Sequence, residues 1–192
     1  QPVNRYLWPT YEACEIHSMS MEFLTWDWMH LFFKEDTDKF LFKHIAGSLA
    51  FLPYGALVDH FQHWVYENPK ATPLERKTQW LELEKMYQPG KNYDDLEFLK
   101  NGGFWQKQAH IYEMPFYYID YTLAQVCAFQ FWIRMQEDKE SAWQDYLNLC
   151  KAGGSMSFLD LVKLANIKSP FDPKVFEEVA NKINNWLNNN KL

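Results

Sequence analysis

The spacing of apolar residues constrains this chain more than any other feature, because it follows the helical period along nearly the whole length. Apolar side chains recur every three or four positions, and proline, glycine or asparagine clusters separate one periodic segment from the next. No run of alternating apolar residues is long enough for a sheet strand, and no internal repeat is present. The sequence therefore predicts an all-α fold.

Capping residues and prolines set the expected helix boundaries. Thr10 is a plausible N-cap, Thr72 and Pro73 form a cap and first-turn pair, and Pro115 and Pro173 fall where helices are expected to begin. The expected helices cover approximately residues 11–33, 37–51, 53–67, 73–87, 94–100, 115–136, 138–150, 156–166 and 173–189.

Composition limits the classes of protein and of partner. A chain of 192 residues that is 47% hydrophobic and 18% aromatic suits one compact domain over residues 1–192. The net charge of -6, with no lysine or arginine stripe, argues against nucleic acid or an anionic membrane as a partner. The apolar stretch 40–58 is interrupted by Lys43, His44 and Pro53, which argues against a membrane span.

The cysteines bear on the compartment. Cys14, Cys127 and Cys150 are far apart and show no C-x-x-C spacing, so neither a disulfide framework nor a thiolate zinc site is indicated. A reducing cytoplasm is the simplest expectation.

Two glutamates in the segment 11–28 stand out among apolar neighbours. A helix turns by about 100° per residue, so Glu15 and Glu22 fall on one face, beside Cys14 and Met21. Either that face is solvated, or it holds something positive, because a carboxylate removed from water needs a cation or several donors. A metal ion would meet that need, and both interpretations stay open on spacing alone.

Two further groups contain metal-ligand residue types. Asp59, His60, His63 and Glu67 have a spacing that lets one helix present several ligands, but such pairs also occur in helices that only pack, and the sequence favours packing. The D-x-x-H pair Asp27–His30 is similar to the motif of carboxylate di-iron bundles. Those sites need a second copy of the motif, and the chain has none.

A third group lies in residues 101–125. Gly102 and Gly103 predict a loop whose backbone can approach a ligand, and His110 follows them. The helix expected from Pro115 then presents three phenols, those of Tyr117, Tyr118 and Tyr121. One imidazole and several phenols can donate hydrogen bonds to an oxyanion, although an aromatic core helix explains the same spacing equally well.

Two strings connect these groups to a known family. "EIHSMSME" resembles the E-x-x-S-x-x-x-E segment of thimet oligopeptidase and oligoendopeptidase F type zinc metallopeptidases, and "HIYEMPFYYIDYTLAQ" resembles their substrate-binding segment. The strings occur in the family's order, and the similarity to the oligoendopeptidase F branch covers essentially the whole chain. It implies the C-terminal part of a zincin-type catalytic domain and hydrolysis of short peptides.

The resemblance also assigns roles to residues. It implies that Glu15 is the third zinc ligand and that Glu22 supports a zinc-bound histidine, with zinc as the cofactor. The remaining candidates are expected to contact the substrate or its tetrahedral intermediate: His110, Tyr118 and Tyr121, with Tyr117 and the loop glycines Gly102 and Gly103 on the substrate side.

The chain departs from the family in one respect. No H-E-x-x-H motif occurs in it, so two zinc ligands and the catalytic glutamate are absent from this sequence. We therefore expect a missing N-terminal part of the same protein to supply them, and the chain alone to be inactive. Two other interpretations remain, a non-catalytic helical binding module and a structural fragment with no separate role.

Overall fold

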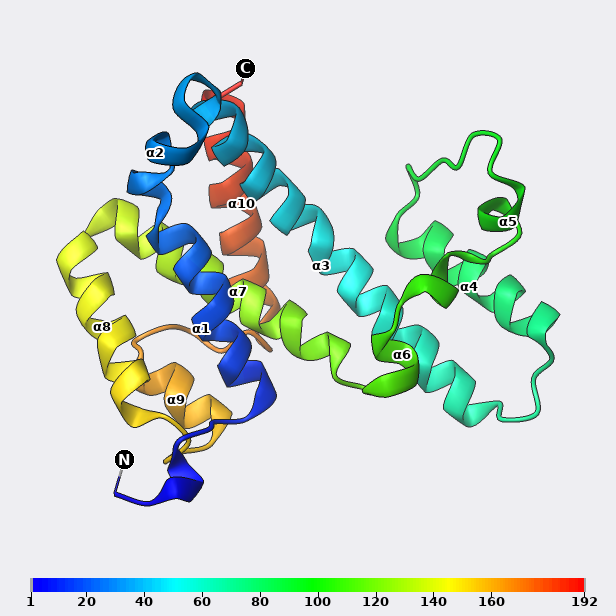
Figure 1. The fold of residues 1–192 in the computed structure, drawn as a ribbon, viewed down its shortest axis with the longest axis horizontal. Coiled ribbons are helices and arrows are strands. Elements are labelled where there is room, and N and C mark those ends of the chain that lie inside the picture. The colour runs from blue at the N-terminus through cyan, green and yellow to red at the C-terminus, as the bar shows by residue number, and fades with distance from the viewer. Residues whose placement is uncertain (1, 192) are drawn as a thin grey trace. The chain divides into compact units, whose positions relative to one another are not determined.

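Figure 1 shows the computed structural model of the chain, which describes residues 2–191. Helices make up its regular structure, and no strand occurs in this range, so the all-α prediction is confirmed. The α-helices are α1 (Tyr11–Leu24), α2 (His30–Phe33), α3 (Thr37–Glu67), α4 (Pro73–Tyr87), α5 (Glu97–Lys100), α6 (His110–Glu113), α7 (Tyr118–Glu137), α8 (Lys139–Ala152), α9 (Phe158–Leu164) and α10 (Pro173–Asn189). The 3₁₀-helices are η1 (Asn4–Tyr6), η2 (Trp26–Trp28), η3 (Lys34–Asp36) and η4 (Phe104–Lys107).

The residues group into two compact units. The first unit combines the chain up to Leu49 with the chain from Leu123 onward, and the second unit is Ala50–Thr122. The expectation of one domain over residues 1–192 stays a prediction.

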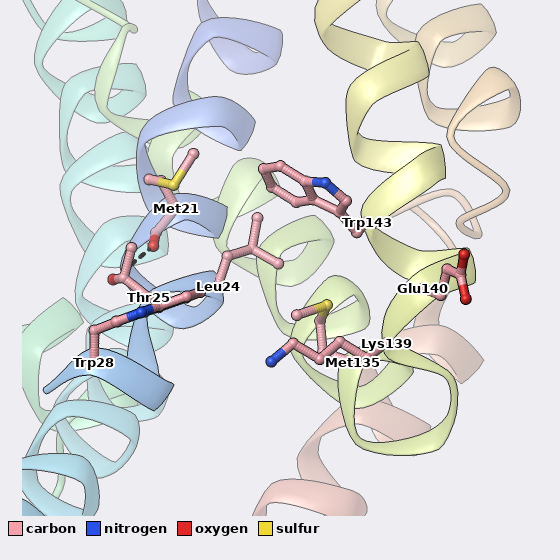
Figure 2. A pocket seen from close by; sticks show the side chains of 8 residues that line it. All are labelled: Met21, Leu24, Thr25, Trp28, Met135, Lys139, Glu140 and Trp143. Carbon is pink, nitrogen blue, oxygen red and sulfur yellow. Dashed lines mark hydrogen bonds between the residues drawn. The ribbon is translucent and has the colours of Figure 1, made fainter. Parts of the chain in front are cut away.

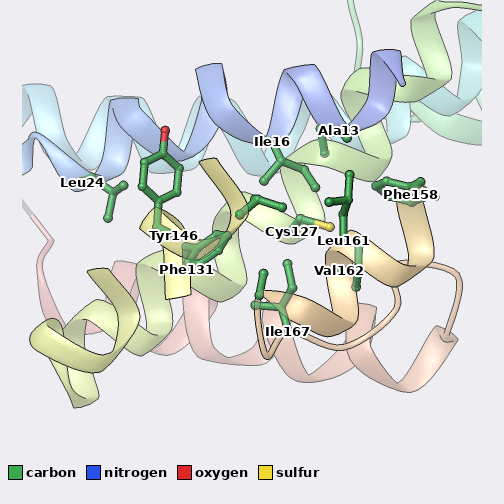
Figure 3. Packing of buried hydrophobic residues seen from close by; sticks show 13 residues of the cluster. Ala13, Ile16, Leu24, Cys127, Phe131, Tyr146, Phe158, Leu161, Val162 and Ile167 are labelled. Carbon is green, nitrogen blue, oxygen red and sulfur yellow. The ribbon is translucent and has the colours of Figure 1, made fainter. Parts of the chain in front are cut away.

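The core of the first unit lies among α1, α7, α8 and α9 (Figure 3). Ile16 from α1, Phe131 from α7 and Leu161 from α9 are at most 1% exposed. Figure 3 shows Ile16 pointing into this cluster, with Tyr146 of α8 beside Phe131. Because α1 buries this apolar face, Glu15 and Glu22 lie outside the core, Glu15 partly exposed and Glu22 exposed.

The core of the second unit is aromatic. Its central contact is edge-to-face, with the ring centroids of Phe61 and Trp80 5.2 Å apart at 89°. Trp80 also donates from Nε1 to the buried carboxylate of Glu84 at 3.2 Å, and Lys91 pairs with the same oxygen at 3.2 Å. The buried members of the cluster are Leu57, Val58, Phe61, Trp80, Leu83 and Trp105.

Two of the expected helix starts follow their sequence signals closely. Thr72 and Glu75 form a reciprocal capping box ahead of α4, in which the Glu75 carboxylate accepts from the Thr72 backbone N–H at 2.7 Å. Pro173 opens α10 behind the N-cap Asp172, as predicted.

Other boundaries differ from the prediction, each for a local reason. The helix expected to reach residue 33 ends at Leu24, where the Thr25 hydroxyl donates back to the Met21 carbonyl at 3.0 Å, and 3₁₀ turns follow. The two helices expected on either side of Pro53 are one 31-residue helix, α3. A proline removes only its own N–H from the ladder, and packing of the surrounding turns overrides that loss.

The stretch Trp26–Glu67 is long and apolar enough to cross a membrane by length and composition alone. The core helix of a soluble protein meets the same criteria, so this is weak evidence for a span. The expected absence of a membrane partner stays a prediction.

Candidate functional site

The α1 carboxylates lie off the helix face that is buried. Ala13 and Ile16 are fully buried, whereas Glu15 is only partly covered. Ser18, one turn later, donates from its hydroxyl to Glu15 Oε2 at 2.8 Å, which orients that carboxylate. Glu15 is therefore partly exposed, with its carboxylate hydrogen-bonded to Ser18.

Glu22 is held by a histidine that sequence spacing did not single out. Its Oε2 lies 3.0 Å from His44 Nε2, and Trp26 Nε1 lies 3.0 Å from His44 Nδ1. An indole N–H can only donate, so Nδ1 of His44 must be the acceptor. The imidazole proton is therefore on Nε2, from which it is donated to the Glu22 carboxylate.

Aromatic packing keeps the His44 ring in place. Its centroid lies 4.7 Å from Phe23 and 5.6 Å from Phe40, the latter in a stacked arrangement at 7°. The His44 side chain is 15% exposed and that of Glu22 is 61% exposed. The histidine is thus a fixed, largely buried donor, and the glutamate presents the exposed end of the pair.

A protein site for a metal ion needs several ligand side chains that converge on one point. Within residues 2–191, no group of three or more histidine, cysteine, aspartate or glutamate side chains is arranged to hold one. A catalytic zinc site normally uses three protein ligands, and Glu15 offers one carboxylate. These residues alone therefore do not fit a zinc site, and two ligands would have to come from elsewhere.

The two weaker metal candidates are engaged in other interactions. His63 Nε2 lies 3.5 Å from Asp59 Oδ2, and His60 Nδ1 lies 3.1 Å from the Tyr87 hydroxyl. Asp27 pairs with Lys139, while His30 Nδ1 lies 2.9 Å from the Asp27 carbonyl. These contacts agree with the packing role that the sequence favoured.

The residues expected to contact substrate come together in the second unit. The His110 ring lies 5.1 Å from Tyr118 at 65° and 5.6 Å from Tyr121 at 90°, between centroids. The Tyr121 hydroxyl lies 3.4 Å from His110 Nε2. Tyr117 joins the same group, with its ring 4.9 Å from that of Tyr121. One imidazole and three phenols therefore share one small region.

His110 and Tyr117 occupy different local structures from those expected. His110 opens the one-turn helix α6 instead of lying in a loop, and α7 begins at Tyr118, so Tyr117 precedes it. Phe116 explains the late start, because its φ of 65° is outside the helical region. The buried Gln62 holds this turn by accepting from the Phe116 N–H at 2.9 Å.

Burial affects one phenol of the group strongly. Loss of hydration, followed by the nearby Tyr121 hydroxyl, raises the pKa of Tyr118 to about 12. The phenol is therefore protonated, and able to donate, throughout the physiological pH range.

His110 has a polar support that the sequence analysis missed. Gln108 donates from Nε2 to His110 Nδ1 at 2.8 Å, and the Tyr54 hydroxyl donates to Gln108 Oε1 at 2.8 Å. The Q-x-H spacing of Gln108 and His110 within residues 101–125 was a usable signal for Gln108. Tyr54 and His44 had none, because each is far in sequence from the residue that it supports.

The two loop glycines are required by packing. Gly102 has a φ of 79°, and a Cβ there would lie 2.2 Å from the Lys77 carbonyl oxygen. A Cβ on Gly103 would lie 2.3 Å from the Phe98 ring. These close approaches explain why glycine occupies both positions, and contact with substrate remains a prediction.

The first unit also has an apolar pocket of about 490 Å³. Figure 2 shows Trp143 of α8 facing Met21 and Leu24 of α1 across it. Its lining residues are Met21, Leu24, Thr25, Trp28, Met135, Lys139, Glu140 and Trp143. Histidine and cysteine are absent from this lining, so the pocket suits an apolar group rather than a metal ion.

Comparison with known proteins identifies the family. The sequence pattern of Peptidase family M3 matches residues 1–180, and no curated protein matches the chain. A structure of PZ peptidase A with an inhibitor is 58% identical with a TM-score of 0.96. The match covers 98% of this chain and 34% of the PZ peptidase A chain. A structure described as oligoendopeptidase F is 60% identical with a TM-score of 0.95. The match covers 98% of this chain and 33% of that protein.

A third structure, described as an oligoendopeptidase F from Bacillus anthracis, is 51% identical with a TM-score of 0.84, and the match covers 100% of this chain and 32% of that protein. The chain thus spans about a third of the length of these proteins. Peptidases of family M3 are zinc-dependent. From its sequence match and its helical fold, the chain belongs to Peptidase family M3.

Proposed function

We propose that this chain is the part of a zinc-dependent oligoendopeptidase that supplies one zinc ligand and the donors that bind the substrate carbonyl. The observation that carries the proposal is the convergence of His110 with Tyr117, Tyr118 and Tyr121 in a chain of family M3. Such a group of donors suits an oxygen that gains negative charge during peptide hydrolysis. The proposed substrates are short peptides.

In this proposal Glu15 is the carboxylate that reaches the metal. Its partial exposure and its hydrogen bond from Ser18 support the assignment, because a ligand must be accessible and oriented. Zinc, when bound, would polarise the scissile carbonyl and lower the pKa of a bound water.

Glu22 acts on a histidine ligand supplied from outside these residues. A carboxylate that accepts from the second nitrogen of a ligating imidazole fixes its tautomer and its orientation. His44 supports this role by holding one carboxylate oxygen of Glu22 at 3.0 Å, which restricts the direction of the other.

His110, Tyr118 and Tyr121 act on the substrate. A peptide carbonyl placed among them would accept from a phenol or from the imidazole, and these hydrogen bonds strengthen as the tetrahedral intermediate forms. The Tyr118 phenol keeps its proton at neutral pH, as a donor must, and its raised pKa extends this to higher pH.

The remaining parts of the site are proposed to come from an H-E-x-x-H segment N-terminal to these residues. Exposed apolar side chains support further protein contacts, with Trp8 79% exposed and Phe32 72% exposed. The three free cysteines support a reducing compartment, and we propose the cytoplasm.

Zinc content and peptide hydrolysis test the proposal. We compare the chain alone with the chain joined behind an H-E-x-x-H segment from an oligoendopeptidase F, here named the joined enzyme. We expect zinc and cleavage of a short quenched peptide only in the joined enzyme, and loss of most of both in Glu15→Ala. Glu12→Ala, in the first turn of the same helix, is the control and should retain both.

Tight stoichiometric zinc in the isolated chain would show that the ligand assignment is wrong. Full zinc content in the Glu15→Ala variant of the joined enzyme would also show that the ligand assignment is wrong.

A further inference from the structure

The polar support of His110 determines which of its nitrogens carries the proton. Gln108 lies two residues before His110, and its amide bridges the imidazole and the hydroxyl of Tyr54. Both contacts are 2.8 Å long, which is a normal hydrogen-bond length. The imidazole therefore sits at the end of a short chain of hydrogen bonds inside the second unit.

Tyr54 determines the donor and the acceptor in each of these hydrogen bonds. Burial, followed by the nearby groups of Tyr118 and Glu84, raises the pKa of the Tyr54 phenol far above its ordinary value. The phenol thus keeps its proton and needs an acceptor, which the Gln108 Oε1 provides. With Oε1 turned to Tyr54, the amide presents its NH₂ group to His110.

An amide NH₂ can only donate, so His110 Nδ1 must be the acceptor. A neutral imidazole has a single proton, which is then on Nε2. That nitrogen lies 3.4 Å from the Tyr121 hydroxyl, a long contact that leaves the N–H able to serve a closer acceptor.

We infer that Tyr54 and Gln108 are positioning residues that hold His110 in the tautomer with its proton on Nε2, so that the imidazole donates to the oxygen of a bound peptide. The catalytic part of this inference rests on the proposed function. The opposite tautomer would present a lone pair to the same oxygen and would repel it as negative charge develops.

The first test reads the tautomer on the 192-residue chain itself, without zinc or peptide. At pH about 9, where an ordinary imidazole is neutral, ¹⁵N-labelled histidine distinguishes protonated from unprotonated ring nitrogens by NMR. A His110→Gln variant assigns the resonances. We expect an unprotonated Nδ1 and a protonated Nε2, and a proton on Nδ1 would overturn the inference.

Variants of the supporting residues make the test specific. Gln108→Glu replaces the donor by a carboxylate that only accepts, so we expect the His110 proton to move to Nδ1. Tyr54→Phe frees the Gln108 amide to turn, and a mixture of tautomers is expected. The control is Gln106→Glu, an exposed position on η4 with the same change of charge, which should leave the tautomer unchanged.

An unchanged tautomer in folded Gln108→Glu would overturn the role of Gln108, and an unchanged tautomer in Tyr54→Phe would overturn that of Tyr54. Dispersion of the amide spectrum establishes that each variant is folded.

The second test measures catalysis in the joined enzyme. We expect Gln108→Glu to lower kcat by about 10²-fold relative to Gln106→Glu, with similar KM and zinc content, because the lost hydrogen bond matters in the transition state. A reversed tautomer with unchanged kcat would overturn the catalytic part. If the joined enzyme binds zinc but never cleaves peptides, the proposed function is refuted. If His110 still shows the expected tautomer, the tautomer inference remains supported.

Discussion

His44 in the first unit and His110 in the second both accept a hydrogen bond at Nδ1, and they differ in what Nε2 faces. In the first unit, Nε2 of His44 lies 3.0 Å from the carboxylate of Glu22. In the second unit, Nε2 of His110 lies 3.4 Å from the hydroxyl of Tyr121. The Nε2–H of His44 donates to a carboxylate, which is a strong acceptor. The Nε2 of His110 has only a long contact with a hydroxyl, which is a weaker one.

The donors behind the two rings also differ. Trp26 has a single possible role, so the tautomer of His44 follows from one contact. Gln108 could turn its amide over, so the tautomer of His110 depends on Tyr54 as well. A partly buried imidazole can therefore be fixed either by one unambiguous donor or by two residues that hydrogen-bond in sequence.

The largest expected effect is the loss of kcat in Tyr121→Phe, beside His110 in the second unit. Tyr121→Phe in the joined enzyme removes one hydroxyl beside His110, so zinc content and folding should persist while kcat falls by about 10² to 10³-fold. Steady-state kinetics with one quenched peptide measure it, and Tyr112→Phe, at a 56% exposed position on α6, is the control.

If the Phe variants of Tyr117, Tyr118 and Tyr121 all keep parental kcat and zinc, the cluster in the second unit is packing. His110 would then have a purely structural role.

The corresponding change in the first unit should act on the metal and not on the transition state. Glu22→Gln keeps the shape of the side chain but weakens its charge-assisted hydrogen bonds, so we expect zinc affinity of the joined enzyme to fall by about 10 to 100-fold. Competition with a chelator measures the affinity. A greater loss of zinc in Glu22→Gln than in Glu15→Ala would show that the two assignments are reversed.

A pair of glycines on α3 compares the two units for stability. A Cβ at Gly55 in the second unit would lie 2.0 Å from Thr122 Oγ1, whereas a Cβ at Gly47 in the first unit meets nothing within 4 Å. We expect Gly55→Ala to lower the free energy of unfolding by about 1 to 3 kcal/mol through overpacking. Gly47→Ala should raise it by about 1 kcal/mol through helix propensity.

Urea unfolding at fixed pH measures both changes. If Gly55→Ala left the free energy of unfolding unchanged or raised it, the close approach of α3 and α7 at Gly55 would be wrong.

The smallest effect at neutral pH concerns Tyr118. Its pKa is raised from 10.0 to about 12, so the folded state favours the protonated phenol. The resulting stabilisation is complete below pH 10 and is lost as pH rises from 10 to 12. We expect Tyr118→Phe to reduce the fall in the free energy of unfolding over that interval. At pH 7 the substitution should change that free energy little. Tyr66→Phe, at a 58% exposed position, is the control.

Local signals explain which parts of the fold could be predicted from sequence. The capping box at Thr72 and the Pro173 start of α10 lie within one helical turn, so the sequence contains the whole interaction. The late start of α7 could not be read in this way. It depends on Gln62, which is distant in sequence and accepts from the Phe116 N–H in a conformation that phenylalanine rarely adopts.

The sequence by itself determined the helical class, the apolar face of α1 beside Glu15 and Glu22, and the strings that connect the chain to family M3. These depend on residue type and short spacing, which a linear pattern contains. Only the tertiary structure placed His44 on Glu22 and Tyr54 on Gln108. Hydrogen bonds between residues 22 or 54 positions apart leave no periodic trace, because their geometry exists only after helices far apart in sequence have packed.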